Sequence, residues 1–446
     1  MNNSNFILTL VICSGIIVSS SAMAVEQSST KATGVISREF GANSSNWDTA
    51  PFNIFSFTLT QRIFPTLIIS RGDGPVSPMR YAPIQIESSK LIVSDPATGR
   101  AMTVDQLLNR RIMNNGLVVI HKGYVVHESY RNGLSRELRH INMSTSKSFT
   151  GMLAQIALQK GYFKENELAS KYVPELRGKK AWKDVTVRDV WDMRDGTKFV
   201  EDYEDENSDV RIQDRSTGWR KRGKGDPEGL RGFIKKYVNE KINPTGKVFN
   251  YSSIQTDILG LIVQGASGKP LAEFFEQELW SKLGAEHDAG FGTDGFGQPI
   301  AQGAISMTLP DFARVALLVL NKGKSFNGRQ IIDEAFFDDL VTPNQTLKDA
   351  FQEQYKFIAP NGNYRSQFWV IDAEKKQFMM VGVYGQIAYF DYENEFALVC
   401  FGSYPIAKDA LLVQSLGKLM DAMLDASSIE PATVRPNLNV LNSVGR

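Results

Sequence analysis

Strand-like segments occur in the first third and the last fifth of this 446-residue chain, and helix-like segments lie between them. Residues 117–121 and 124–128 are β-branched runs joined by Lys122-Gly123, which predicts a tight hairpin. Residues 367–371, 378–383, 387–391 and 396–401 form a second group typical of an antiparallel meander. We therefore expect an α+β fold in which the N- and C-terminal strands share one antiparallel sheet beside a mostly helical lobe.

The middle of the chain carries helical patterns. From Ser144, apolar residues recur at helical spacing until Gly161, and residues 252–265 show a similar face. Residues 186–193 predict a short capped helix, and residues 407–424 predict a final helix. Residues 201–224 are first acidic and then basic with scattered glycines, so we predict a long loop that borders a binding site.

The first residues have the pattern of a targeting segment. The apolar stretch from Phe6 to Val18 precedes Ala22-Met23-Ala24, which has the spacing of a signal-peptide cleavage site. An uncleaved anchor is the alternative, but the stretch is short for a membrane span. We predict a signal peptide at residues 1–24, a flexible lead-in at 25–50 and one domain at 51–446. The protein would then be periplasmic or secreted, with no stable membrane span in the mature chain.

The charge composition indicates which classes of partner to expect. Lysine and arginine number 50 against 49 acidic residues, so no excess of positive charge suggests binding to nucleic acid, and a small-molecule substrate is expected. Removal of the signal peptide would remove Cys13 and leave Cys400, which lies in an apolar run typical of a core strand. The sequence does not indicate an oligomeric state.

Ser144-Thr145-Ser146-Lys147 is the strongest local motif for chemistry. The spacing i, i+3 at the start of a helix places the hydroxyl and the amine on one face, where they can touch. A serine hydroxyl needs a neighbouring base to become a nucleophile, and burial can keep a lysine neutral enough to act as that base. Alone, the motif is more often a helix cap followed by a surface lysine.

Two further segments can complete a site. Tyr251, just before a predicted helix, can relay a proton to a leaving group if a nearby cation holds its pKa down. Gly382 lies on a predicted strand, where it would let substrate approach closely, and the Val383 N–H could join the Ser144 N–H as an oxyanion hole. The alternatives are a half-buried structural tyrosine and a glycine needed for packing.

In this order, Ser144-x-x-Lys147, Tyr251-Ser-Ser253 and Val381-Gly382-Val383 resemble the three motifs of class C β-lactamase-related serine hydrolases and penicillin-binding proteins. Residues 201–203, 251–260 and 385–386 resemble the 6-aminohexanoate-dimer (nylon oligomer) hydrolase branch. The resemblance implies a serine β-lactamase-like fold and an acyl-enzyme on Ser144, without metal or cofactor. It also implies substrate binding by Tyr203, beside carboxylates that could receive a substrate ammonium.

This sequence departs from the β-lactam-active members in two motifs. Met380-Val381-Gly382 stands where they carry Lys-Thr-Gly or His-Thr-Gly, so the cation and hydroxyl that would hold a carboxylate are missing. Ser253 stands where asparagine is common, but its hydroxyl can still contact the Lys147 ammonium. We expect hydrolysis of small amides or esters. A β-lactamase or D,D-peptidase, and a non-catalytic binding protein on the same fold, remain as alternatives.

The histidines are weaker candidates. His121, His127, His140 and His287 lack the spacing of metal ligands. His140 precedes Ser144 by only four residues without a nucleophile elbow, so a Ser-His-Asp triad is not expected.

Overall fold

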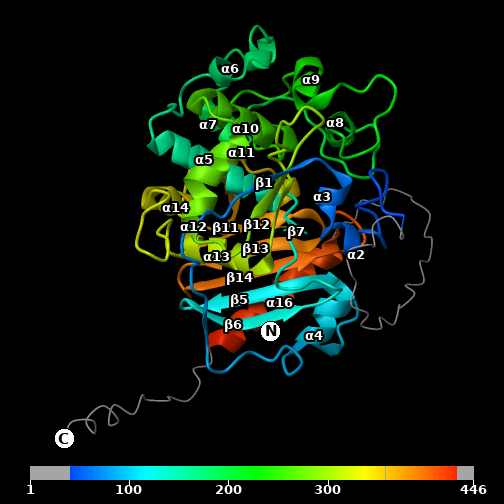
Figure 1. Ribbon diagram of the computed structural model, residues 1–446, viewed down its shortest axis with the longest axis vertical. Helices are drawn as coiled ribbons and strands as arrows, with labels where there is room; N and C mark the ends of the chain where they lie inside the picture. Colours follow the sequence, from blue (N-terminus) through cyan, green and yellow to red (C-terminus); the bar gives the residue numbers. More distant parts are fainter. Residues whose placement is uncertain (1–40, 357, 429–446) are drawn as a thin grey trace, which may run out of the picture. The chain divides into compact units, whose positions relative to one another are not determined.

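An eight-stranded sheet joins the two ends of the chain in the computed structural model, which describes residues 41–356 and 358–428 (Figure 1). Its strands, in spatial order, are β10 (Asn363–Arg365), β11 (Phe368–Asp372), β12 (Gln377–Gly382), β13 (Gln386–Asp391), β14 (Phe396–Gly402), β5 (Asn114–His121), β6 (Tyr124–Tyr130) and β2 (Arg80–Tyr81). The two groups of strands meet where Val399 of β14 pairs with Val118 of β5, antiparallel. The predicted α+β fold with a shared sheet is confirmed.

The hairpin between β5 and β6 follows from its turn residues. Lys122 and Gly123 both have positive φ, 51° and 78°, as a two-residue turn that matches the twist of the strands requires. All neighbouring strands of this sheet run antiparallel except β2 and β6.

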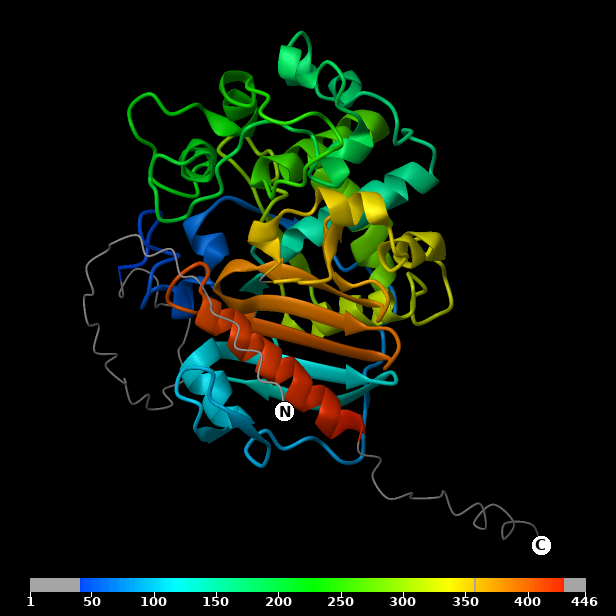
Figure 2. The same cartoon turned by 180° about the vertical axis from the view of Figure 1, so that it is seen from behind.

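Both faces of the large sheet are covered because apolar side chains point alternately to each side. Figure 2 shows α16 (Ala410–Ser428) lying across one face of this sheet. Leu117 and Val119 of β5 belong to the apolar core on that side, together with Leu412 and Leu416 of α16. Val118 and Ile120 face the opposite core, where α13 (Leu309–Leu320) packs against β14 and β5. The final helix predicted at 407–424 is confirmed with slightly later bounds.

A second, four-stranded sheet includes the strand that precedes helix α5 (Thr145–Gln159). It contains β1 (Thr66–Ile69), β8 (Ala289–Gly292), β9 (Ile305–Met307) and β7 (His140–Ile141), and a separate pair is formed by β3 (Ile92–Ser94) and β4 (Ala101–Thr103). Strand β7 ends just before Ser144.

The helical lobe lies on one side of the large sheet in Figure 1. Its two long helices, α5 (Thr145–Gln159) and α10 (Ser253–Ser267), pack against each other. The short helix predicted near 186–193 is α7 (Val187–Trp191), which begins with a capping box between Thr186 and Asp189. These three predictions are confirmed.

The remaining helices are mostly short. They are α2 (Asn53–Ser56), α3 (Thr60–Ile63), α4 (Val104–Leu107), η1 (Leu108–Ile112), α6 (Ala169–Tyr172), η2 (Pro174–Leu176), η3 (Lys180–Trp182), α8 (Asp209–Thr217), α9 (Gly229–Lys236), α11 (Leu271–Phe275), η4 (Glu276–Trp280), α12 (Ser281–Leu283), α14 (Glu334–Leu340), α15 (Gln345–Ala350), η5 (Glu353–Tyr355) and η6 (Val383–Gly385).

The prediction of a long loop at 201–224 is wrong in its centre, where α8 forms. Ser208 caps the helix by accepting a hydrogen bond from the Arg211 N–H, and Gly218 ends it with φ 85°. The helix lacks an apolar stripe because Arg211, Gln213 and Asp214 are among its buried residues. These buried side chains are stabilised by polar contacts, so the sequence of α8 does not show the apolar repeat by which a helix is recognised.

The lead-in predicted as flexible at 25–50 is packed in its described part, residues 41–50. Trp47 is 2% exposed and its indole Nε1 donates to the Trp219 carbonyl at 2.9 Å. Asp48 is also buried, so the folded region begins before residue 51. The signal peptide predicted at 1–24 lies outside the described residues. Within them, no helix is both long and apolar enough to cross a membrane.

Candidate active site

Ser144 lies at the N-terminus of α5, directly after a sharp turn. Met143 has φ 48°, in the left-handed region that few non-glycine residues adopt, and it redirects the chain from β7 into the helix. Ser144 and Lys147 are both buried, and the Lys147 Nζ donates to the Ser144 Oγ at 2.9 Å. The contact predicted from the i, i+3 spacing is present.

Lys147 is held by acceptors from distant segments. Its Nζ also lies 3.0 Å from the Ser253 Oγ and 2.8 Å from the Gln302 carbonyl oxygen. Burial lowers the pKa of the Lys147 ammonium below the ordinary lysine value of 10.5, although nearby carboxylates partly oppose this effect. A larger fraction of this amine is therefore neutral, and able to accept a proton, than for a surface lysine at the same pH.

Tyr251 completes the polar cluster at the start of α10. The Lys147 Nζ is 5.2 Å from the centre of its ring, and its hydroxyl hydrogen-bonds Ser144. Burial is the largest cause that raises the pKa of Tyr251 well above 10.0, and the charge of Glu201 adds to it, while the bond to Ser144 lowers it. The condition set for a proton relay, that a nearby cation holds this pKa down, is not met, because desolvation dominates. Tyr251 stays a neutral phenol.

Gly382 ends β12 where the strand crosses the beginning of α5. A Cβ at this position would lie 2.9 Å from the Asn142 carbonyl oxygen and 3.1 Å from the Ser144 nitrogen. The glycine is thus required for contact between two parts of the protein, and the prediction that it makes room for substrate is not supported. Val383 follows and borders the same pocket as Ser144.

The pocket beside Ser144 has an aromatic wall and a charged wall. Tyr203, the predicted substrate-binding residue, lines it. The other lining residues are Trp47, Asp48, Met143, Val210, Arg211, Asp214, Trp219, Gln302, Gly303, Val383 and Tyr384. The prediction that residues 201–224 border a binding site is therefore confirmed, although part of this segment is helix α8. The contribution of the N-terminal segment was not predicted.

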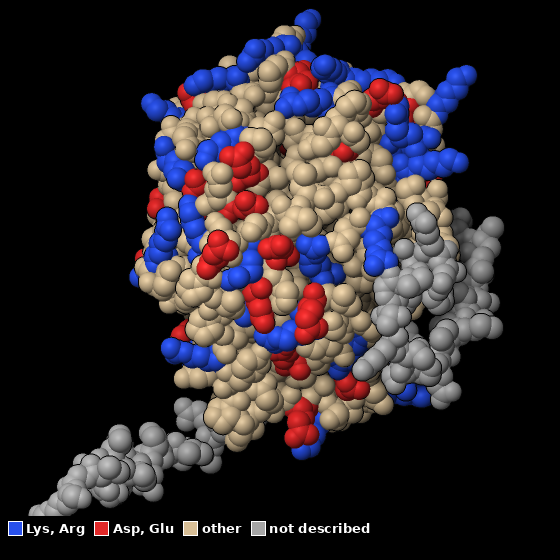
Figure 3. Space-filling view, viewed as in Figure 1, with Lys and Arg blue, Asp and Glu red and all other residues tan. Residues whose placement is uncertain are grey.

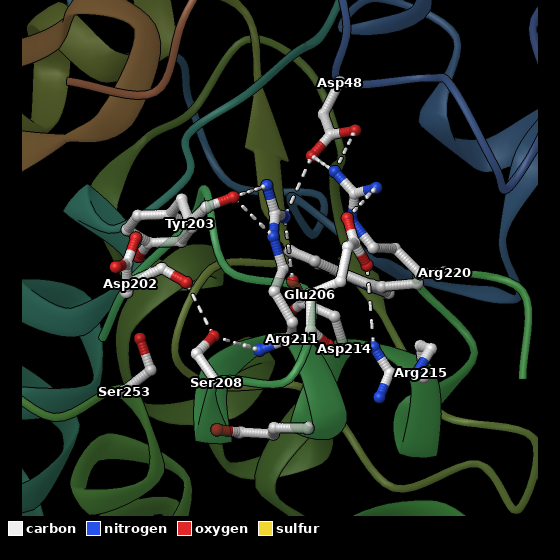
Figure 4. A network of polar contacts seen from close by, with 12 residues as sticks. Asp48, Asp202, Tyr203, Glu206, Ser208, Arg211, Asp214, Arg215, Arg220 and Ser253 are labelled. Carbon is white, nitrogen blue, oxygen red and sulfur yellow. Dashed lines mark hydrogen bonds and ion pairs between the residues drawn. The ribbon is translucent and has the colours of Figure 1, made fainter. Parts of the chain in front are cut away.

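The charged wall is a network of ion pairs, shown in Figure 4. One Nη atom of Arg220 lies 2.7 Å from a carboxylate oxygen of Asp48. Arg211 lies 3.5 Å from Asp48 and 3.4 Å from Asp214, and its Nε donates to the Tyr203 carbonyl at 2.8 Å. Each acidic side chain that lines the pocket is therefore matched by a guanidinium group.

The carboxylates around Tyr203 are already engaged, which does not support the predicted ammonium site. The Glu201 carboxylate accepts bonds from the Tyr203 hydroxyl and from the Ser253 hydroxyl and N–H. The Asp202 carboxylate accepts from the Glu204 N–H. An ammonium at Glu201 would compete with three donors, whereas the exposed Asp202 carboxylate keeps free acceptor sites.

Sequence reasoning missed the residues that surround the Lys147 amine from outside α5. Gln302 is 155 positions away and contacts Lys147 mainly through its backbone carbonyl, with its side-chain oxygen further off at 3.4 Å, so no motif pointed to it. Asp257 lies one turn after the start of α10, and its carboxylate accepts from the Gln302 N–H at 3.1 Å. Residues 201–203 were part of the family resemblance, but no role was predicted for Glu201, because its contact with Ser253 arises only in the fold.

His140 takes no part in the polar cluster around Ser144. Its ring nitrogens contact the Asn115 side chain and the Ile141 carbonyl, and burial lowers its pKa to about 4. In residues 41–356 and 358–428, no group of three His, Cys, Asp or Glu side chains is placed to hold a metal ion.

Comparison with known proteins agrees with this geometry. The family model "Beta-lactamase" matches residues 100–405. A 6-aminohexanoate-dimer hydrolase from Paenarthrobacter ureafaciens is 29% identical over 362 residues, which cover 81% of this chain and 88% of that protein.

Solved structures share the fold. A Bacillus anthracis protein provisionally named a 6-aminohexanoate-dimer hydrolase superposes with a TM-score of 0.77 at 23% identity, covering 88% of this chain and 99% of the other. EstCE1, a hydrolase with promiscuous acyltransferase activity, gives a TM-score of 0.56 at 14% identity, covering 72% and 96%. The chain belongs to the Beta-lactamase family and is a serine hydrolase.

Proposed function

We propose that the protein cleaves a small amide or ester through an acyl-enzyme on Ser144. The observation that carries this proposal is the 2.9 Å contact between the Ser144 Oγ and the buried Lys147 Nζ. Burial keeps the amine partly neutral, so it can take the hydroxyl proton as the oxygen attacks.

The steps follow from the surrounding groups. The Ser144 Oγ attacks the carbonyl carbon and its proton passes to the Lys147 Nζ, while the Ser144 and Val383 N–H groups receive the negative charge on the carbonyl oxygen. Tyr251, a phenol in contact with Ser144, gives its proton to the leaving nitrogen or oxygen and is reprotonated from Lys147. Water then attacks the ester, with the same groups acting in reverse.

The substrate class rests on what lines the pocket and on the relatives. The hydrolase from Paenarthrobacter ureafaciens is named for a dimer of 6-aminohexanoate, which is a linear amide. Position 381 is a valine on β12, so this strand offers no hydroxyl or cation near Ser144 to hold the carboxylate of a β-lactam. We therefore propose linear amides and esters ahead of β-lactams.

We also propose export, since residues 1–24 have the pattern of a cleaved signal peptide. Expression with the full leader should give a periplasmic or secreted product whose intact mass corresponds to cleavage near Ala24. A cytosolic product that keeps residue 1 would contradict it.

The nucleophile can be tested with a fluorophosphonate probe and a p-nitrophenyl ester. Wild type should be labelled and should turn over the ester, whereas Ser144→Ala should lose both. Ser148→Ala is the matched control, because this buried serine lies on α5 but donates to the Gln367 carbonyl. Equal labelling of wild type and Ser144→Ala would overturn the proposal. Rapid hydrolysis of nitrocefin with no activity on linear amides would favour a β-lactamase.

A further inference from the structure

We propose that Glu201 is a positioning residue. By accepting the hydroxyl proton of Ser253, it makes the Ser253 oxygen an acceptor for Lys147, and this leaves the lone pair of the neutral amine facing Ser144. The inference rests on the proposed function, because it concerns how the base is aimed.

Glu201 contacts Ser253, and its carboxylate accepts three hydrogen bonds. One oxygen accepts from the Ser253 N–H at 2.8 Å. The other accepts from the hydroxyls of Ser253 and Tyr203, each at 2.5 Å. An ionised carboxylate has no hydrogen to give, so both hydroxyls must donate to it.

The direction of the Ser253 hydroxyl fixes what it can do for Lys147. Its one hydrogen is used on Glu201, so its oxygen can only accept from the Lys147 Nζ, 3.0 Å away. The Gln302 carbonyl oxygen, 2.8 Å from the same nitrogen, is also only an acceptor.

A neutral lysine amine has two hydrogens and one lone pair. The Ser253 oxygen and the Gln302 carbonyl, at 3.0 and 2.8 Å, take the two hydrogens, and the Gln302 Oε1, at 3.4 Å, is the most distant of the four oxygens around this nitrogen. The remaining direction, toward the Ser144 Oγ at 2.9 Å, is left for the lone pair. The network therefore prepares Lys147 to accept the Ser144 proton without prior rearrangement.

The same geometry accounts for a serine at position 253. A hydroxyl can donate or accept, so by itself it could turn its hydrogen toward the lone pair of Lys147 and block the base. An asparagine oxygen would have no such choice. Glu201 removes the choice from Ser253.

Glu201 also acts through its charge. It is the first of three acidic groups, with Asp257 and Asp214, whose charges raise the pKa of Lys147 against the lowering by burial. The neutral base is present above its pKa and is lost as the pH falls through it, so removal of the Glu201 charge should move the acid limb of the rate profile to lower pH.

Glu201→Gln tests both roles of Glu201, the direction of the Ser253 hydroxyl and the charge that raises the pKa of Lys147, because each has its own readout. The Ser253 N–H requires the amide oxygen on its side, so the amide NH₂ would face the Ser253 hydroxyl and turn it toward Lys147. The rate constant for fluorophosphonate labelling on the pH plateau should fall roughly tenfold or more. The acid limb should shift to lower pH. Glu201→Asp should keep the wild-type limb, and Glu204→Gln, an exposed neighbour, is the matched control.

A double mutant tests the hydroxyl directly. Ser253→Ala alone should slow labelling and leave the limb near wild type, because the Glu201 charge remains. In Glu201→Gln it should instead recover part of the rate, because the misdirected hydroxyl is gone. A thermal melt of each variant would show that it is folded.

An unchanged limb in folded Glu201→Gln, or additive effects of the two changes, would overturn the inference. Failure of the proposed function would look different, because wild type itself would then show no labelling that depends on Ser144.

Discussion

Tyr251 shows at the residue scale how burial changes the chemistry expected from a motif. Its position before a helix predicted a phenol near the serine and lysine, which the structure confirms. Desolvation could not be judged before the fold was known, and it raises the pKa of Tyr251 and leaves this residue a proton donor. The i, i+3 spacing made the Ser144–Lys147 contact predictable, whereas Gln302 and Glu201 reach the site only through the fold.

Tyr251→Phe should therefore affect substrates according to their leaving groups. An amine leaving group needs a proton, so kcat/KM for a linear amide should fall by roughly 100-fold or more. A p-nitrophenyl ester, whose leaving phenolate needs none, should lose much less. Steady-state rates on both substrates provide the comparison. An equal loss on both would contradict a proton-donor role.

Helices and strands differed in how well the spacing of their apolar residues predicted them. The strands of the large sheet and helices α5 and α10 were predictable because apolar residues repeat at the period of each element. Helix α8 was not predictable, since its buried residues Arg211 and Asp214 are charged. Their burial is compensated by ion pairs that only the fold brings together. Residues 41–50 were missed for a related reason, because Trp47 and Asp48 bind to the segment that follows α8.

Asp48 links the N-terminal segment to Arg211 and Arg220, and all three side chains are mostly buried. Asp48→Asn removes the nearest carboxylate of the buried Arg220 and leaves Arg211 with Asp214 alone, so the free energy of unfolding should fall by about 3 kcal/mol. Urea denaturation measures the change. Asp73→Asn, at an exposed position, should have little effect. If both variants unfold alike, the segment does not stabilise the domain.

The distribution of charge matters at the scale of the whole molecule. The sums of basic and acidic residues nearly cancel, and the face in Figure 3 carries both signs, with Lys and Arg more frequent toward the helical lobe. The pocket repeats this balance, because Asp48 and Asp214 face Arg211. We expect the pocket to favour acyl chains that carry no charge.

Arg211→Gln should change that preference. Asp214 would lose its guanidinium partner, so esters with an ammonium-ended acyl chain should gain kcat/KM by about tenfold relative to uncharged esters. Burial raises the pKa of Asp214 to about 7 while the charge of Arg211 opposes this effect, so loss of Arg211 raises the pKa further and the assay belongs well above pH 7. The matched control is Arg215→Gln. Arg215 lies one turn further along α8 and pairs with Asp226 outside the pocket, so its loss should leave the ratio unchanged. No change in Arg211→Gln would mean that the network does not select substrates.

The most direct measurement is the intact mass of enzyme quenched with acid during turnover of a p-nitrophenyl ester, followed by peptide mapping. The account predicts one added acyl group on the peptide that contains Ser144, absent from Ser144→Ala, which should not turn over the ester. An acyl group on another residue, or turnover that persists in Ser144→Ala, would contradict it.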